Sequence, residues 1–147
     1  MSSESAERPP AIQNEDVKAK IRGSITRSVN AFNQSDVETI LGAYAADAVV
    51  LPPHSPAVQG LLAIRQLFES LLATGYHNAT LELDRIELWG DVALVVGRYS
   101  VQIPTKSGSF DVDRGKHVGH WRRTSGGQFR VTVSMWSSDR WRRPSDP

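Results

Sequence analysis

Histidine is the side chain in this sequence best suited to proton transfer, because its ordinary pKa lies near neutral pH. His117 lies in a stretch of alternating residues, Asp111 to Trp121, that predicts a β-strand. It could act as a general base or acid on a bound small molecule. It could also be a partly buried histidine that only shapes the wall of a pocket, and the sequence leaves both interpretations open.

His54 is the second candidate for proton transfer. It follows Pro52-Pro53 in a predicted loop, where a histidine is often simply solvated. His120 has the opposite strand parity to His117, so these two cannot bind one metal ion from a regular strand. His117 and His54 are therefore the predicted catalytic residues.

Motifs for metals and phosphates are missing from the sequence. There is no His-x-x-x-His pair and, because the chain has no cysteine, no thiolate ligand. Asp111 and Asp113 would need further ligands from elsewhere. Gly126-Gly127 belongs to a predicted hairpin turn and does not open a helix, as a phosphate-binding loop does. We expect neither a metal nor a cofactor.

The composition is that of one globular domain. The 147 residues are 39% hydrophobic and 22% charged, enough for one core and too few for two. The formal net charge of +1 gives no overall field for nucleic acid or a membrane surface, so we expect neither as a partner. The sequence has no apolar run of membrane-spanning length, and MSSESAERPP does not resemble a signal peptide, so we expect a cytoplasmic protein.

The first helix is predicted to begin at Asn14, which can cap it, after a flexible tail of residues 1–13 rich in Ser, Glu and Pro. Its apolar residues follow the three-to-four spacing of one buried stripe: Val17, Ile21, Ile25, Val29 and Phe32. Residues 140–147 hold a basic cluster around Trp141 and are predicted to be a solvated tail. Residues 14–139 form one predicted domain.

Two further helices are predicted before the longer strands begin. Ser35 and Glu38 form a capping box, in which each side chain accepts a hydrogen bond from the other residue's backbone N–H. The second helix then carries Tyr44 inward and ends near Asp47. The third helix buries a stripe that includes Phe68.

The second half of the chain predicts a sheet. A short apolar run, Ala48 to Leu51, ends at two prolines. Four longer segments with period-two patterning follow: 79–89, 92–103, 109–123 and 128–138. Short turns join these strands, so they pair antiparallel. The predicted fold class is α+β, with three N-terminal helices packed on one face of a curved, mostly antiparallel sheet.

Several short motifs occur in a characteristic order: YAADAV at 44–49, PP at 52–53, AIR at 63–65, DRGKH at 113–117, WRR at 121–123 and MWSSD at 135–139. In this order and spacing the chain resembles the SnoaL-like branch of the nuclear transport factor 2-like superfamily, which includes SgcJ/EcaC-type proteins. The resemblance covers residues 14–139. It implies a cone-shaped, cystatin-like roll in which the curved sheet and the helices enclose a pocket, often in a homodimer.

The resemblance also indicates which sheet face is inward, because in this family the tryptophan near the end of the last strand commonly faces the pocket. With strand parity, this implies an inward face of His117, Gly119, Trp121, Thr132, Ser134 and Trp136. The outer face would then be apolar, with Val118, Val131, Val133 and Met135. Such a face usually requires a partner, so we expect a homodimer through it.

Aromatic residues could line the pocket around a flat, apolar ligand. The predicted substrate-binding residues are Tyr44, Phe68, Tyr99, Trp121, Ser134 and Trp136. For any one aromatic residue, an ordinary place in the core is an equal alternative.

Ketosteroid isomerase has the same fold class, and its mechanism needs a carboxylate base with a Tyr and a protonated Asp as hydrogen-bond donors. Aligned on the second-helix motif and the terminal tryptophan, those three groups fall at Pro52, Ser28 and Gly119. None of these residues can perform the corresponding role. We therefore expect no ketosteroid isomerisation by that machinery.

Three functions remain open. The first is a SnoaL-like isomerase, cyclase or dehydratase that moves a proton on an apolar cyclic or aromatic substrate, through His117 or His54. The second is non-catalytic binding of a small apolar molecule. The third is a dimerisation or association module that uses the outer sheet face.

Overall fold

The structure is a computed structural model that describes residues 10–140, with side chains described from residue 13 onward. The helices are α1 (Pro10–Asn33), α2 (Val37–Gly42) and α3 (Leu61–Thr74). The strands are β1 (Tyr44–Leu51), β2 (Val58–Gln59), β3 (His77–Trp89), β4 (Val92–Pro104), β5 (Phe110–Arg123) and β6 (Phe129–Ser138). The strands form one sheet in the order β2-β1-β6-β5-β4-β3.

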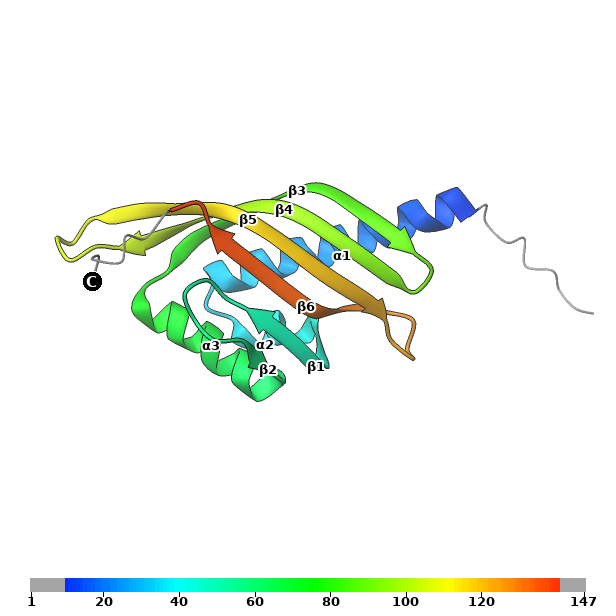
Figure 1. Cartoon of the computed structure of the whole chain (residues 1–147), viewed down its shortest axis with the longest axis horizontal. Coiled ribbons are helices and arrows are strands. Elements are labelled where there is room, and N and C mark those ends of the chain that lie inside the picture. The colour runs from blue at the N-terminus through cyan, green and yellow to red at the C-terminus, as the bar shows by residue number, and fades with distance from the viewer. Residues whose placement is uncertain (1–9, 141–147) are drawn as a thin grey trace, which may run out of the picture.

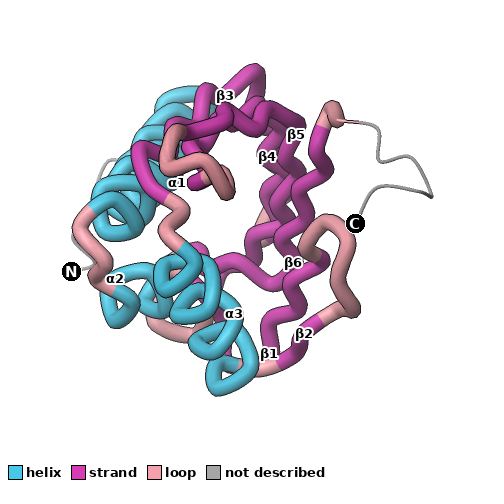
Figure 2. Tube along the Cα trace, turned by 90° about the vertical axis from the view of Figure 1, so that its left-hand side faces the viewer, coloured by secondary structure: helices cyan, strands magenta, loops and turns pink. Residues whose placement is uncertain are grey.

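The sheet is mixed, open and curved, and all three helices lie on its concave side (Figures 1 and 2). Strands β3 to β6 form the predicted antiparallel meander, whereas β1 pairs with β6 in parallel. The predicted α+β fold class is therefore confirmed. In the described residues, no helix has the length and apolar character needed to cross a membrane.

The first two helices begin at other residues than predicted. Helix α1 starts at Pro10, so residues 10–13 are helical and Asn14 is not its cap. Proline is favoured in the first turn because its missing N–H would have no helical partner there. The remainder of the predicted N-terminal tail, residues 1–9, and the basic cluster from Trp141 onward lie outside the described residues.

Helix α2 is capped by Asp36, whose carboxylate accepts a hydrogen bond from the Thr39 backbone N–H at 3.2 Å. The predicted Ser35–Glu38 capping box is wrong, because Ser35 has a positive φ of 58°. The Asp36 carboxylate also accepts from the Thr39 hydroxyl at 2.6 Å, so one residue provides the cap.

Helix α2 ends at Gly42, and residues 44–47, which were predicted to be helical, begin strand β1. Tyr44 pairs with Val131 of β6, and the Val131 backbone N–H donates to Ala43 at 2.8 Å. These contacts join segments far apart in the sequence, so they override a local pattern that is compatible with a helix.

A β-bulge in β6 changes which side chains face inward. His120 pairs with Val133, but its neighbour Trp121 pairs with Val131, so Thr132 is the extra residue. Val131 therefore belongs to the buried core, and Thr132 contacts the imidazole of His120. The predictions of an inward-facing Thr132 and an outward-facing Val131 are both wrong for this reason.

The buried core has two clusters. The first joins α1 to the sheet through Ile21, Ile25, Ile86, Ala93, Val95, Trp121 and Val131. The second joins α2 and α3 to β1 through Leu41, Ala45, Ala48, Val50 and Ile64. Trp121 and Val131 of the first cluster, and Phe68 and Trp136 packed on the second, also line a cavity between the helices and the sheet.

Candidate functional site

A cavity of about 700 Å³ lies between the concave face of the sheet and the helices. Its wall is built by residues from all three helices, from β1, from the loop that follows β1 and from β3 to β6. All eight residues predicted as catalytic or substrate-binding line it: Tyr44, His54, Phe68, Tyr99, His117, Trp121, Ser134 and Trp136. The structure thus brings together residues that are widely separated in the sequence.

His117 lies on β5, where it pairs with Gly97 of β4 and Trp136 of β6. Its Nε2 is 3.3 Å from the hydroxyl oxygen of Ser134. Its Nδ1 is buried and has no hydrogen-bond partner in the described part of the chain. Burial lowers the pKa of His117 to about 4, because a charged imidazole loses its hydration there. The side chain is therefore neutral at pH 7.

Gly119 separates His117 from Trp121 on the cavity face of β5. The indole Nε1 of Trp121 is also buried without a hydrogen-bond partner among the described residues. A Cβ atom added to Gly119 would lie 3.1 Å from this nitrogen and 3.2 Å from Cε1 of His117. A side chain at this position would crowd both rings, so the glycine allows the imidazole of His117 and the indole of Trp121 to lie close together on the cavity face.

Four aromatic residues form another part of the cavity wall. Phe68 of α3 stacks on Trp136 of β6 with ring centroids 6.5 Å apart and an interplanar angle of 26°. Tyr44 and Phe32 approach the same phenyl ring at 6.1 and 6.4 Å. Burial raises the pKa of Tyr44 to about 12, and a hydrogen bond with Ser134 partly opposes this rise. Tyr44 is therefore an uncharged wall residue at neutral pH.

Asp113 is a buried carboxylate in the cavity wall that was not among the predicted site residues. It accepts hydrogen bonds from the Tyr99 hydroxyl at 3.0 Å and from the Ser138 hydroxyl at 2.6 Å. Burial and the neighbouring Asp113 charge together raise the pKa of Tyr99 above its ordinary range. Asp113 has the same strand parity as His117, and this signal could have identified it.

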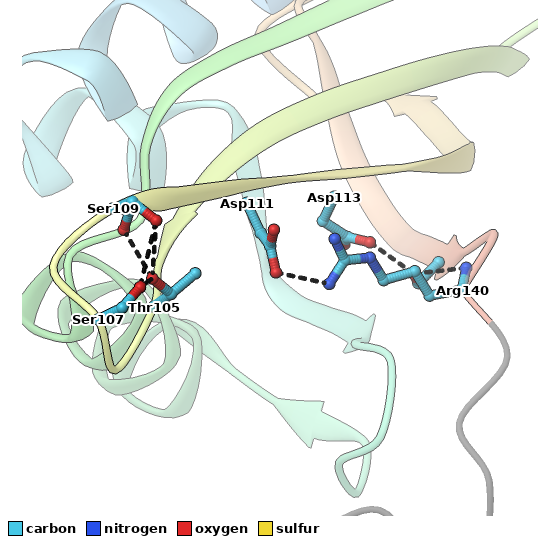
Figure 3. A network of polar contacts seen from close by, with 7 residues as sticks. Thr105, Ser107, Ser109, Asp111, Asp113 and Arg140 are labelled. Carbon is cyan, nitrogen blue, oxygen red and sulfur yellow. Dashed lines mark hydrogen bonds and ion pairs between the residues drawn. The ribbon is translucent and has the colours of Figure 1, made fainter.

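Figure 3 shows Asp113 and Arg140 of the cavity wall together with polar residues near them. Arg140 extends its guanidinium toward Asp111, at 3.3 Å between Nη1 and Oδ2. The Arg140 backbone N–H donates to the Ser138 hydroxyl at 3.1 Å. Thr105, Ser107 and Ser109 form a separate hydroxyl cluster in the β4–β5 turn.

The remaining candidates differ in position. His54 lies in the loop after β1, is exposed, and has a positive φ of 58°. It therefore borders the cavity from its solvent side. His120 lies outside the cavity wall, in hydrogen-bond contact with Thr132. Within the described residues, no group of three His, Cys, Asp or Glu side chains could hold a metal ion.

Comparison with protein families gives a match between residues 25–132 and the SnoaL-like domain. This chain belongs to the SnoaL-like domain family. No curated protein matches this SnoaL-like chain.

Solved structures with the same fold include a ketosteroid isomerase-like protein from Erwinia carotovora atroseptica, with a TM-score of 0.77 and 20% identity over 87% of this chain and 99% of that one. An NTF2-like protein with a cystatin-like fold from Novosphingobium aromaticivorans has a TM-score of 0.76 and 19% identity over 88% of this chain and 86% of that one. A putative calcium/calmodulin dependent protein kinase II association domain from Xanthomonas campestris has a TM-score of 0.64 and 18% identity over 86% of this chain and 88% of that one. These similarities establish the fold and leave the activity open.

The positions aligned with the catalytic groups of ketosteroid isomerase can now be located in this SnoaL-like fold. Pro52, Ser28 and Gly119 all line the cavity. The first and third have no ionisable side chain, and the serine hydroxyl is a poor acid. The cavity therefore presents different chemistry at those positions, and its ionisable groups lie elsewhere, at His117 and Asp113 among others.

Proposed function

We propose that this SnoaL-like protein binds a small, mainly apolar cyclic molecule in its cavity and transfers a proton on it, as an isomerase, cyclase or dehydratase without a cofactor. One observation carries the proposal: a neutral imidazole, His117, stands in the wall of a cavity of about 700 Å³. Cavities of this size, mainly apolar with a few polar groups, are the usual sites for small molecules.

The unpartnered nitrogen atoms support a ligand with an oxygen atom at one end. A buried polar atom without a hydrogen bond costs about 1–3 kcal/mol, so His117 Nδ1 and Trp121 Nε1 both favour a partner. A carbonyl oxygen of the ligand would accept a hydrogen bond from the Trp121 Nε1–H, and the lone pair of His117 Nδ1 would then be available to a proton of the ligand. Because both nitrogen atoms are buried, the imidazole and the indole ring must both shift for a ligand to reach them.

The same arrangement supports proton transfer next to a carbonyl group. The neutral His117 takes a proton from the carbon beside the carbonyl, while the Trp121 N–H stabilises the negative charge that develops on the oxygen. The imidazolium then returns that proton to another carbon of the same molecule, or to a departing hydroxyl group, which leaves as water. Its pKa of about 4 favours this return.

Non-catalytic binding is the second candidate function, and the low pKa of His117 also favours it. A base works best when its pKa lies near the working pH, and a pKa of about 4 reduces the driving force for taking a proton at pH 7. In this alternative, His117 only forms a hydrogen bond to the ligand.

Exchange of the protons beside the carbonyl of 4-phenylcyclohexanone for deuterium, followed by NMR in D₂O, tests the proposal without knowledge of the natural substrate. We expect the protein to accelerate the exchange and His117→Gln to reduce that acceleration on the order of 10²-fold. His54→Gln replaces the exposed histidine and serves as the comparison. Binding without exchange supports the non-catalytic function, and the absence of both contradicts the proposal.

We also propose that the protein forms a homodimer through the outer face of its sheet. Val133 and Met135 support this, because they are 37% and 42% exposed on β6, a central strand of the sheet. Exposed apolar side chains on a sheet face commonly mark an interface. The β6 bulge removes Val131 from this face, so the apolar patch is smaller than its sequence pattern predicts.

A further inference from the structure

We propose that the cavity has a second polar subsite, at Asp113, which binds a protonated amine on the ligand. The inference rests on the proposed function, because it assigns the ligand's chemical class at the other end of the same cavity. The predicted ligand is an elongated molecule with a carbonyl or hydroxyl oxygen at the His117 end, an apolar ring system in the middle and a basic amine at the Asp113 end.

The hydrogen bonds of the Asp113 carboxylate leave room for a ligand. Asp113 lines the cavity and is only 9% exposed. Its two oxygen atoms each accept one hydrogen bond, from the hydroxyl groups of Tyr99 and Ser138. A carboxylate offers about four acceptor positions, so acceptor capacity remains for a ligand. The two hydroxyl groups also fix the carboxylate in one orientation in the cavity wall.

The hydrogen-bond donors of Asp113 do not balance the negative charge of its carboxylate. Both of its hydrogen-bond donors are neutral, and burying a carboxylate without an opposite charge is costly. Among residues 13–140, no lysine, arginine or histidine forms an ion pair with Asp113. Arg140 lines the same cavity but pairs with the exposed Asp111. A protonated amine would supply the missing positive charge and a charge-assisted hydrogen bond.

The distance along β5 between the two polar ends of the cavity sets the length of the ligand. Asp113 precedes His117 by four residues and Gly119 by six on the same face of β5. An extended strand places the corresponding Cα atoms about 13 and 20 Å apart. A single ring is too short to reach both ends of this span. Two linked or fused rings with an amine on a short side chain match it, and the cavity volume of about 700 Å³ admits such a molecule.

Two isosteric probes test the amine subsite: 4-[4-(dimethylaminomethyl)phenyl]cyclohexanone, which is cationic at pH 7, and 4-(4-isobutylphenyl)cyclohexanone, which is neutral. Calorimetry on the full chain measures both affinities. We expect the cationic probe to bind at least about tenfold more tightly than the neutral one, as one charge-assisted hydrogen bond predicts. Asp113→Asn should remove this preference, so that the two probes bind with equal affinity.

Two further variants keep the test interpretable. Tyr99→Phe retains the carboxylate and should retain the preference, which separates the charge of Asp113 from its hydrogen bond with Tyr99. If Asp113→Asn does not fold, the comparison of the two probes on the wild-type protein still tests the subsite. Asp84→Asn removes an exposed carboxylate outside the cavity wall and should leave the affinities of both probes unchanged. Equal affinity of the two probes for the wild-type protein, or a preference that survives Asp113→Asn, would overturn the amine subsite and leave the proposed function standing. Failure of both probes to bind would overturn both.

Discussion

His117 is the residue on which the proposed chemistry depends, and its environment explains its properties. It faces the cavity, and among the described residues its imidazole is in hydrogen-bond contact with the neutral Ser134 hydroxyl and with no carboxylate. A catalytic histidine is often held by a carboxylate that stabilises its charged form. Without one, burial dominates and lowers the pKa to about 4. The residue is therefore suited to hydrogen bonding and to brief proton transfer, and poorly suited to holding a charge.

The stability of the protein should depend on this residue below neutral pH. The unfolded chain binds a proton at His117 with a pKa near 6.5, whereas the folded protein does so only near 4, so the unfolded state holds more protons between these values. The free energy of unfolding is therefore not reduced by His117 above pH 6.5, and it decreases as the pH falls from 6.5 toward 4. The loss in unfolding free energy amounts to about 3 kcal/mol.

Urea denaturation of the wild type and His117→Gln across this pH range measures the effect. The variant should lack this part of the pH dependence, and His54→Gln, at an exposed site, should retain it. A histidine resonance of His117 that titrates with a pKa near 6.5 would contradict the account.

Strand β5 carries both polar ends of the cavity, and Gly115 lies between them. A Cβ atom at Gly115 would lie 2.1 Å from the Ser137 carbonyl oxygen and 2.6 Å from Cε1 of Tyr99. The missing side chain thus lets the Tyr99 ring cross the strand and place its hydroxyl on Asp113. The φ of Gly115 is not in the left-handed region, so its backbone conformation does not require glycine. Glycine is required here because the Ser137 carbonyl oxygen and the Tyr99 ring lie so close.

Gly115→Ala should therefore destabilise the fold by about 1–3 kcal/mol, because the added methyl group forces the backbone or Tyr99 to move. Thermal or urea unfolding measures this change. Gly42→Ala is the matched control, since a Cβ there meets nothing within 4 Å and alanine favours the helical conformation. Equal stability of Gly115→Ala and the wild type would show that this close approach is not required.

The sequence predicts the positions of the long strands well. It predicts poorly where β1 begins and where the register of β6 changes. Period-two patterning located β3 to β6 within a few residues, and parity together with the family resemblance placed His117, Gly119 and Trp121 on the cavity face. The strand identity of Tyr44 depends on its pairing with β6, and the change of parity at Thr132 depends on a bulge. Both features arise from contacts between distant segments, which a local pattern does not contain.

The whole molecule is a curved sheet with helices on its concave side, and this architecture creates the cavity (Figure 2). The family motifs in the sequence predict that architecture and its cavity-lining residues. They do not predict Asp113 as part of the site, because its importance depends on Tyr99 and Ser138, from two other strands. The fold alone does not specify the reaction, since the same architecture serves unrelated functions.

Association through the outer sheet face is a property of the whole molecule. We expect sedimentation velocity at micromolar concentration to show a dimer, and Met135→Lys to shift it toward the monomer, because a charge at this position would be desolvated in the interface. Leu62→Lys places the same charge at a 70% exposed site on α3 and should leave the dimer intact. A wild-type monomer under these conditions would refute the dimer and leave the cavity proposal unaffected.

The most direct test of the central claim is an NMR titration of ¹⁵N-labelled protein with 4-phenylcyclohexanone, observing the indole N–H of Trp121 and the ring nitrogens of His117. Replacement of Trp121 by Phe assigns the indole signal, and Trp89, 59% exposed, provides an internal control. If the cavity binds a cyclic carbonyl compound beside Gly119, the Trp121 and His117 signals will shift and saturate together while Trp89 remains unchanged. Signals of Trp121 and His117 that do not move, or that move only as much as Trp89, would contradict the claim.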